Sequence, residues 1–219
     1  EAGTIAKKIS EKGVKITIKK DSSPVTDGDL EVDKILKDRI KKLTPNIPII
    51  SEETVNLNLI NKNQTFWLID PIDGTKDYIK KRDEYTLNAA LISDLKPSIG
   101  MVYAPAKDRL FFSYGKGSAF EIYKGKKIVL DCKKKTGNEI IALANSNDTP
   151  NEVLEIYKKY NVSKIVKMSS SLKFCVIAAG EADIYAAKAR AFEWDIAAGH
   201  AILEHAGGLL TDHQNKKFL

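Results

Sequence analysis

The sequence of 219 residues predicts a protein of α+β and α/β type in two parts, an antiparallel sheet with helices followed by a smaller α/β layer. Three observations predict it. Short runs of alternating apolar and polar residues recur between positions 85 and 131, as in an antiparallel sheet with one face on a core. Before them, apolar residues spaced three and four apart predict helices. After position 139, the pattern changes to alternating strands and helices, which is typical of an α/β layer.

The elements of the first part follow in chain order. We expect helices over 1–12 and 28–43, separated by a strand over 14–20 whose apolar residues alternate. Further strands are expected over 47–53, 65–70, 85–92, 98–105, 109–115, 119–125 and 126–131. Gly, Pro and Asp separate these runs, as turns require. The helices are expected to cover one side of the sheet.

The basic stretch 131–139 is interpreted as a linker, so we expect an N-terminal domain at 1–132 and a C-terminal domain at 133–219. In the second domain we expect strands over 140–146, 162–168, 182–187 and 209–212, and helices over 150–160, 170–180 and 194–208. Because the two domains differ in type, active-site residues contributed by both would lie at their junction, where clefts are common.

Composition bounds the classes of protein to consider. Hydrophobic residues make up 43% and charged residues 29%, as in soluble globular proteins. No apolar run reaches the roughly 18–20 residues of a membrane span, and we expect no signal peptide. The two cysteines, Cys132 and Cys175, are too far apart for a CxxC motif and favour a reducing compartment. We expect a cytoplasmic protein, with peripheral association with the inner membrane face left open.

The net charge of +6 raises the question of a nucleic-acid partner. The basic residues occur in small groups spread along the chain, and none interleaves with aromatic residues as a stacking platform would. We therefore expect no nucleic-acid partner. A basic exterior would still attract a small polyanion.

The stretch WLIDPIDGTKDY, residues 67–78, carries the clearest chemical signal. Pro71 disfavours a helix at Asp70 and removes an N–H, so the chain must turn where the strand ends. In a tight turn Asp70 and Asp73 can converge, and the Ile72 carbonyl can point with them. Converging carboxylates repel each other unless a cation neutralises them, and hard oxygen ligands suit Mg²⁺ or Mn²⁺. For this stretch alone, an ordinary capped turn stays open.

Gly74 and Thr75 follow this turn. Gly74 allows close approach of the backbone, and the amides of both residues, at the start of a helical turn, could hold a phosphate. The lysines of KDYIKKRDE, residues 76–84, could meet a substrate phosphate or lie in a solvated loop.

Three further acidic stretches support a metal site. Glu52 and Glu53 follow an apolar strand, Asp195 opens a helix, and Asp27 and Asp29 precede another helix. Each fits a surface loop or a helix cap when taken alone. If all the structural explanations were correct, unrelated turns and caps would together happen to supply the full ligand set of a multi-metal phosphatase. The metal site is therefore the better interpretation.

The blocks SSPVTDGD, ISEE, WLIDPIDGTKDY and EWDIAAGHAILEHAGG together resemble the signature of the inositol monophosphatase superfamily of Mg²⁺-dependent, lithium-sensitive phosphatases. They occur in the family's order and spacing through essentially the whole chain, and D-P-I-D-G-T and W-D-x-A-A-G are highly specific. The resemblance implies a layered αβαβα sandwich of the sugar-phosphatase type. YTLNAALI, GMVYAPAKDRLFF and SSLKFCVIAAGEADIY are most similar to the 3'(2'),5'-bisphosphate nucleotidase branch, which acts in sulfur metabolism.

By matched position, the resemblance implies the metal ligands. Glu52, Asp70 and the Ile72 carbonyl would hold one ion, while Asp70, Asp73 and Asp195 would hold a second, with Asp70 bridging. A third, weaker ion would lie near Glu52. The implied cofactor is Mg²⁺, two to three ions, with Mn²⁺ as a substitute and Li⁺ as an inhibitor.

The resemblance also implies the catalytic and binding residues. Thr75 and Asp29 would accept and orient the proton of the attacking water, with Glu52 assisting, and Gly74 and Thr75 would hold the phosphate. Glu53 is not matched, so we expect it to point elsewhere and to tolerate change. Substrate contacts would come from Ser170, Lys173 and Asp195.

The implied reaction is the removal of the 3'-phosphate of adenosine 3',5'-bisphosphate by in-line attack of a metal-activated water, which gives AMP and phosphate. The substrate 3'-phosphoadenylyl sulfate is also considered. The chain departs from the nucleotidase branch at 145–148 and 186–187, although Lys188 and Arg190 lie close by. An inositol or sugar monophosphate phosphatase therefore stays open, as does a catalytically silent metal- or anion-binding regulator. Dimers are frequent among relatives, so a homodimer also stays open.

Overall fold

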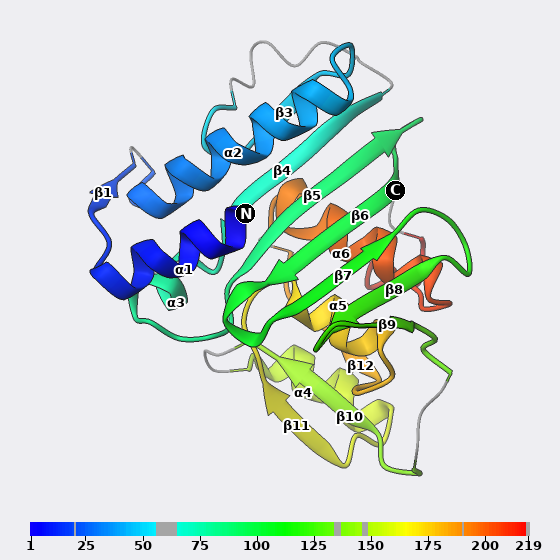
Figure 1. The fold of residues 1–219 in the computed structure, drawn as a ribbon. Coiled ribbons are helices and arrows are strands. Elements are labelled where there is room, and N and C mark those ends of the chain that lie inside the picture. Colours follow the sequence, from blue (N-terminus) through cyan, green and yellow to red (C-terminus); the bar gives the residue numbers. More distant parts are fainter. Residues whose placement is uncertain (20, 56–64, 134–136, 146–148, 190, 218–219) are drawn as a thin grey trace.

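The computed structural model describes residues 1–19, 21–55, 65–133, 137–145, 149–189 and 191–217 (Figure 1). Its main feature is a seven-stranded sheet whose strands are neighbours in chain order. These are β3 (Ile49–Ser51), β4 (Thr65–Asp73), β5 (Thr86–Ser93), β6 (Lys96–Ala104), β7 (Arg109–Ser113), β8 (Ala119–Tyr123) and β9 (Lys126–Val129). All neighbours are antiparallel except β3 and β4, which are parallel. The antiparallel sheet predicted for 85–131 is confirmed.

Helices cover both faces of this sheet (Figure 1). On one face α1 (Ala2–Lys12) packs on α2 (Asp27–Leu43), which packs on β4. On the other face α6 (Glu193–His205) packs on β4 to β8 and on α5 (Leu172–Ala178). The helices of the first part cover one side of the sheet, as expected, and a second helical layer from the C-terminal part covers the other side. Alternating apolar and polar residues show that one face of a strand is buried. They do not show which segment of the chain covers that face.

A second, smaller sheet supplies the predicted α/β layer. In it β10 (Ile141–Ala144) lies between β11 (Lys164–Lys167) and β12 (Ile184–Tyr185), and all three strands are parallel. Between β10 and β11 the chain forms α4 (Asn151–Lys159), and α5 lies between β11 and β12.

The strand expected over 209–212 does not form. Within the described residues, this segment makes a single antiparallel bridge, between Thr211 and Lys217. Leu209 is exposed, whereas Leu210 packs against the core. A strand needs a hydrogen-bonded neighbour along its length, and one bridge does not provide it.

Short elements complete the described chain. The hairpin of β1 (Ile16–Ile18) and β2 (Pro24–Thr26) leads into α2, α3 (Thr75–Ile79) follows β4, and a 3₁₀ turn, η2 (Pro105–Lys107), follows β6. Cys132 and Cys175 are both unpaired. No described helix has both the length and the apolar character needed to cross a bilayer.

Two apolar clusters hold α6 and α2 against opposite faces of the large sheet. The main cluster combines Leu68, Val102 and Phe111 of the sheet with Leu172 and Ile202 of α5 and α6. The second cluster lies on the α1 and α2 side and contains Val32, Ile72, Tyr78 and Leu87. Since the main cluster draws on both sides of position 132, the boundary between 1–132 and 133–219 stays a prediction.

Candidate metal centre

Three carboxylates converge where β4 ends. Ligand oxygens of Asp70, Asp73 and Asp195 all lie within 4.8 Å of one another. Residues three apart in a regular strand point to opposite faces. Here the pairing of β4 with β5 shifts between Asp70 and Asp73, around Pro71, which has no N–H to give to the ladder. This irregularity brings the two aspartates to one side.

Asp70 is the most enclosed of the three carboxylates. Its residue is 1% exposed, and among the described residues neither of its oxygens has a hydrogen-bond partner. Burial, together with the charges of Asp73 and Glu52, raises the pKa of Asp70 well above its ordinary value. Burial and the charge of Asp195 raise the pKa of Asp73 to about 7. A buried carboxylate without a donor is costly, and a divalent cation would remove that cost, so these oxygen ligands fit Mg²⁺.

Asp195 reaches the centre from the first turn of α6. Its Oδ2 accepts the Phe192 N–H at 2.9 Å, which closes the start of the helix. Burial raises the pKa of Asp195. The Phe192 ring, 57% exposed, stacks on Trp194 with ring centres 4.9 Å apart and planes 23° apart. A stacked aromatic pair, of which Phe192 is exposed and Trp194 is half-buried, therefore lies beside this carboxylate.

Asp29 and Thr75 form a pair between α2 and α3. Thr75 Oγ1 lies 3.3 Å from Asp29 Oδ1 and 3.1 Å from the Ile72 carbonyl oxygen. Asp29 Oδ2 accepts the backbone N–H of Thr26 at 2.8 Å and its hydroxyl at 2.5 Å, within a capping box. Burial raises the pKa of Asp29. Asp27 lies apart from this pair and accepts the N–H of Lys15 at 2.9 Å.

Gly74 forms the corner between β4 and α3. Its φ of 89° and ψ of 35° are left-handed values that favour glycine. The N–H groups of Asp77 and Tyr78 donate to the Gly74 carbonyl, and the first N–H groups of a helix have no partner within it. A Cβ at Gly74 would lie 3.3 Å from the Glu84 carbonyl and 3.7 Å from Ser170 Cβ, so Ser170 adjoins this corner.

Glu52 and Glu53 follow β3 and share one cation. The Nζ of Lys19 lies 3.0 Å from Glu52 Oε1 and 2.8 Å from Glu53 Oε1. Burial raises the pKa of Glu53 to about 7. Glu53 lies outside the group of aspartates, so its pointing away from the metal ligands and its tolerance of change stay predictions. Glu52 lies outside the 4.8 Å group of aspartates, although its charge contributes to the raised pKa of Asp70.

The turn before α5 connects the C-terminal part to the centre. The Ser171 N–H donates to Asp73 Oδ2. Lys173 is buried, and its Nζ donates to the Ser170 carbonyl at 2.6 Å and lies 5.1 Å from the centre of the Tyr185 ring. Lys173 is thus built into the turn, and its charge opposes the raised pKa of Asp73. Its substrate contact, like that of Ser170, stays a prediction.

Residues at and beside the departures from the nucleotidase branch make contacts of their own. The Tyr185 hydroxyl donates to Asn145 Oδ1 at 3.0 Å, and Lys188 pairs with Glu152 at 3.0 Å. Arg190 and residues 146–148 lie outside the described residues.

A buried polar network behind the aspartates was missed by sequence reasoning. The Ser171 hydroxyl donates to Asn88 Oδ1 at 2.8 Å and lies 2.9 Å from Thr86 Oγ1, and all three residues are buried. Buried polar groups need partners. The polar Asn88 within the apolar run of β5 is therefore the signal that could have pointed to the network.

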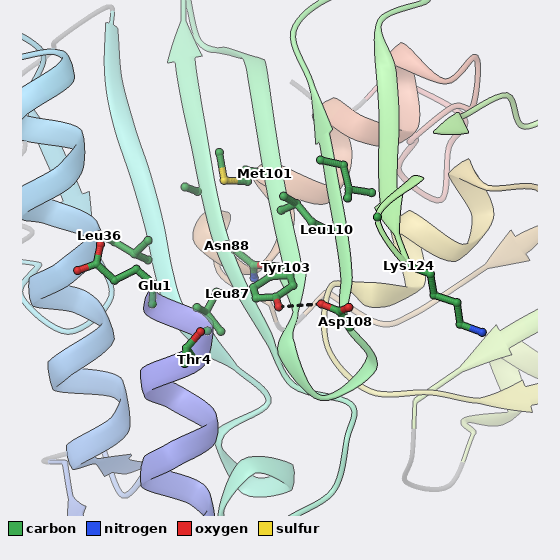
Figure 2. A pocket seen from close by; sticks show the side chains of 15 residues that line it. Glu1, Thr4, Leu36, Leu87, Asn88, Met101, Tyr103, Asp108, Leu110 and Lys124 are labelled. Carbon is green, nitrogen blue, oxygen red and sulfur yellow. Dashed lines mark hydrogen bonds between the residues drawn. The ribbon is translucent and has the colours of Figure 1, made fainter. Parts of the chain in front are cut away.

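A cavity of about 380 Å³ lies away from the carboxylates (Figure 2). Its lining includes the first turn of α1 together with Leu87, Met101, Tyr103 and Leu110 of the sheet. Leu87 packs on the α1 and α2 side. Asn88 is also among the lining residues, whereas none of the three aspartates lines the cavity.

Comparison with known proteins agrees with this geometry. Residues 1–219 match the inositol monophosphatase family. The chain is 41% identical over 204 residues to the 3'(2'),5'-bisphosphate nucleotidase CysQ of Buchnera aphidicola, covering 91% of this chain and 75% of the relative. It is 34% identical over 206 residues to CysQ of Escherichia coli K12, covering 94% and 82%.

Two solved structures show the same fold. CysQ of Bacteroides thetaiotaomicron superimposes with a TM-score of 0.75 at 30% identity, covering 94% of this chain and 82% of that one. The IMPase of Thermotoga maritima superimposes with a TM-score of 0.81 at 26% identity, covering 99% and 83%. The resemblance found in the signature blocks is thereby confirmed.

Proposed function

The chain belongs to the inositol monophosphatase family, and on that premise we propose that it is a metal-dependent 3'(2'),5'-bisphosphate nucleotidase. Its substrate is adenosine 3',5'-bisphosphate, from which it releases the 3'-phosphate to leave AMP. One observation carries the proposal: the convergence of Asp70, Asp73 and Asp195, with both Asp70 oxygens unpartnered among the described residues. We place the protein in the cytoplasm, where its two unpaired cysteines would stay reduced.

The cofactor is Mg²⁺, two to three ions, with Mn²⁺ as a substitute and Li⁺ as an inhibitor. Asp70, Asp73 and Asp195, together with Glu52 and the Ile72 carbonyl, would hold the ions. When bound, the ions neutralise these carboxylates, offset the charge of the phosphate ester and lower the pKa of the attacking water. Glu52 pairs with Lys19 at 3.0 Å, and it would have to give up part of this contact to hold an ion.

Thr75 and Asp29 take the proton of the water. The Thr75 hydroxyl lies between two acceptors, Asp29 Oδ1 and the Ile72 carbonyl, so its own proton is engaged and its lone pairs are left to accept a hydrogen bond from the water. The raised pKa of Asp29, caused by burial, makes its carboxylate a stronger base. The N–H groups of Gly74 and Thr75, at the start of α3, bind the phosphoryl oxygens as negative charge grows on them.

The aromatic pair beside Asp195 favours a nucleotide over inositol phosphate. Phe192 bonds to Asp195 through its backbone N–H and exposes its ring, which stacks on Trp194. A purine base can extend this stack, and a base–aromatic contact contributes about 1–3 kcal/mol. An inositol ring has no π-face to offer. Ser170, next to Gly74, and Lys173 are the further proposed contacts to the substrate.

Phosphate release from two substrates tests the proposal. The purified chain is assayed with adenosine 3',5'-bisphosphate and with inositol 1-phosphate, in Mg²⁺, in EDTA and in Mg²⁺ with Li⁺. We expect release that requires Mg²⁺, falls with Li⁺ and is faster from the nucleotide. Faster release from inositol 1-phosphate would replace the nucleotidase by the inositol phosphatase, and no Mg²⁺-dependent release from either would leave the silent regulator.

Asp73→Asn tests the metal assignment. The substitution keeps the size of the side chain and removes one ligand charge, so we expect turnover to be abolished while the circular dichroism spectrum stays unchanged. Asp83→Asn is the matched control, because Asp83 pairs with Lys107 at the surface, and it should keep full activity. Normal hydrolysis by Asp73→Asn would show that the assignment is wrong.

A further inference from the structure

Asn88 lies directly behind the candidate metal centre. It is the cross-strand partner of Asp70 in the pairing of β4 with β5, and the Cβ atoms of such partners are about 5 Å apart. Within the described residues, Asn88 Nδ2 has no hydrogen-bond partner, and the same is true of both Asp70 oxygens. Buried polar groups are nearly always paired, so an unpaired donor opposite an unpaired acceptor requires an explanation.

The hydrogen bonds of Ser171 determine the direction in which Asn88 can donate. The Ser171 hydroxyl has one proton, which it gives to Asn88 Oδ1, an acceptor only. Thr86 must then be the donor in its 2.9 Å contact with Ser171 Oγ. The amide oxygen of Asn88 is thus occupied, and its NH₂ group is left for another acceptor. If the Asn88 amide were flipped, its oxygen would face the Asp70 carboxylate, and two hydrogen-bond acceptors would oppose each other.

The same network reaches Asp73 by a second route. The backbone N–H of Ser171 donates to Asp73 Oδ2. Thr86 is the cross-strand partner of Asp73, as Asn88 is of Asp70. Asn88 and Thr86 of β5 therefore lie opposite Asp70 and Asp73. Ser171, from the C-terminal part, joins Asn88 and Thr86 by hydrogen bonds.

We propose that Thr86, Ser171 and Asn88 form a positioning network for the metal-binding aspartates, in which Asn88 Nδ2 donates to an Asp70 carboxylate oxygen when that carboxylate is turned to bind a cation. The inference rests on the proposed metal site and adds the residues that orient it. Hydrogen bonds to the ligands of a metal fix their direction, and losing one typically lowers metal affinity by about 10–100-fold.

Calorimetric titration of Mg²⁺ into the resting protein, without substrate, tests the network. We expect Asn88→Ala and Ser171→Ala to raise the Kd for Mg²⁺ by about 10–100-fold. Ser171→Thr keeps the hydroxyl and should retain most of the affinity. Ser98→Ala is the matched control, since the Ser98 hydroxyl donates to the Leu91 carbonyl on the same sheet; its Kd should not change.

Asp73→Asn and thermal unfolding separate the outcomes. If Asp73→Asn loses Mg²⁺ binding while Asn88→Ala and Ser171→Ala bind normally, the inference is overturned and the metal site stands. A lower unfolding temperature with an unchanged Kd in these variants means a structural role alone, and overturns it too. Normal binding by Asp73→Asn would instead overturn the metal site and the proposed function.

The test does not depend on the folding of Asn88→Ala. Thr86→Val keeps the shape of the side chain and removes the donor at the end of the network, while Thr86→Ser keeps that donor. We expect Thr86→Val to weaken Mg²⁺ binding and Thr86→Ser to restore it. Equal affinity in these two variants would contradict the network.

Discussion

Asp29 and Asp195 each close the start of a helix and are also residues of the candidate site. In both residues Oδ2 accepts hydrogen bonds at the start of a helix, from Thr26 and from Phe192 respectively. Oδ1 of Asp29 lies within reach of Thr75. A cap contributes about 1 kcal/mol to a helix, and it also holds the carboxylate in one direction. The capping and the catalytic interpretations of these residues, which compete in the sequence, are therefore compatible.

Phe192→Ala tests the aromatic contact at the scale of a single residue. We expect KM for adenosine 3',5'-bisphosphate to rise about tenfold or more, because a base–aromatic contact of about 1–3 kcal/mol is lost. KM for inositol 1-phosphate should stay within about twofold, since that substrate has no base to stack. Steady-state kinetics on both substrates make the comparison.

Tyr114→Ala is the control for this prediction, because Tyr114 is similarly exposed, 56%, in the hairpin between β7 and β8. It should change neither KM. An equal rise of both KM values in Phe192→Ala would indicate that Phe192 supports the start of α6 and does not stack on the substrate.

At the scale of elements, the close packing of α6 on β6 places Asp195. Gly100 of β6 has no side chain, and a Cβ there would overlap the Ala198 carbonyl and lie 2.9 Å from Ala201 Cβ. Both alanines belong to the helix that begins with Asp195 in its first turn. The distance of α6 from the sheet therefore sets the distance of Asp195 from the two aspartates of β4.

Gly100→Ala should move that helix. Overpacking a core costs about 1–3 kcal/mol, so we expect a lower unfolding temperature. We also expect weaker Mg²⁺ binding by calorimetry, because Asp195 is displaced with α6. Met101→Ala, at the next position and on the other face, is the control that should leave Mg²⁺ affinity unchanged. Normal Mg²⁺ affinity in a folded Gly100→Ala would show that the packing of α6 does not determine the site.

At the scale of the whole molecule, the metal-free centre makes stability depend on pH. Burial raises the pKa values of Asp73 and Glu53 to about 7, from ordinary values of 3.8 and 4.5. Between those limits the folded protein holds protons that the unfolded chain has released. The free energy of unfolding therefore falls as pH rises from about 4 to about 7.

Mg²⁺ should counteract this fall in stability with rising pH. In EDTA we expect the unfolding temperature to fall between about pH 5 and about pH 7.5, and saturating Mg²⁺ should raise it more at the higher pH, where protons no longer compete for the carboxylates. Differential scanning fluorimetry measures both effects. In Asp73→Asn the raised pKa of Asp73 is absent, so the fall in EDTA should be smaller. A stabilisation by Mg²⁺ that is the same at both pH values would contradict the expectation.

Local patterns were sufficient for much of the fold. The alternation over 85–131 predicted the antiparallel strands β5 to β9, and the helices over 1–12 and 28–43 differ from α1 and α2 by one residue at their starts. The prediction of a strand over 209–212 was wrong, because a strand needs a hydrogen-bonded neighbouring strand, which the local sequence pattern does not reveal. The ion pair of Glu53 with Lys19 was not predicted for a similar reason, since Lys19 lies 34 positions away.

By itself the sequence determined the family and the residue types of the centre, because the turn at Pro71 and Gly74 and the acidic residues beside helix starts are local features of the chain. Only the tertiary structure decided how those residues are held. The N–H that reaches Asp73 comes from Ser171, 98 positions away, and the partner of Asn88 is 83 positions away. Such contacts arise when two sheets and two helical layers pack together. The spacing of residues along the chain does not predict them.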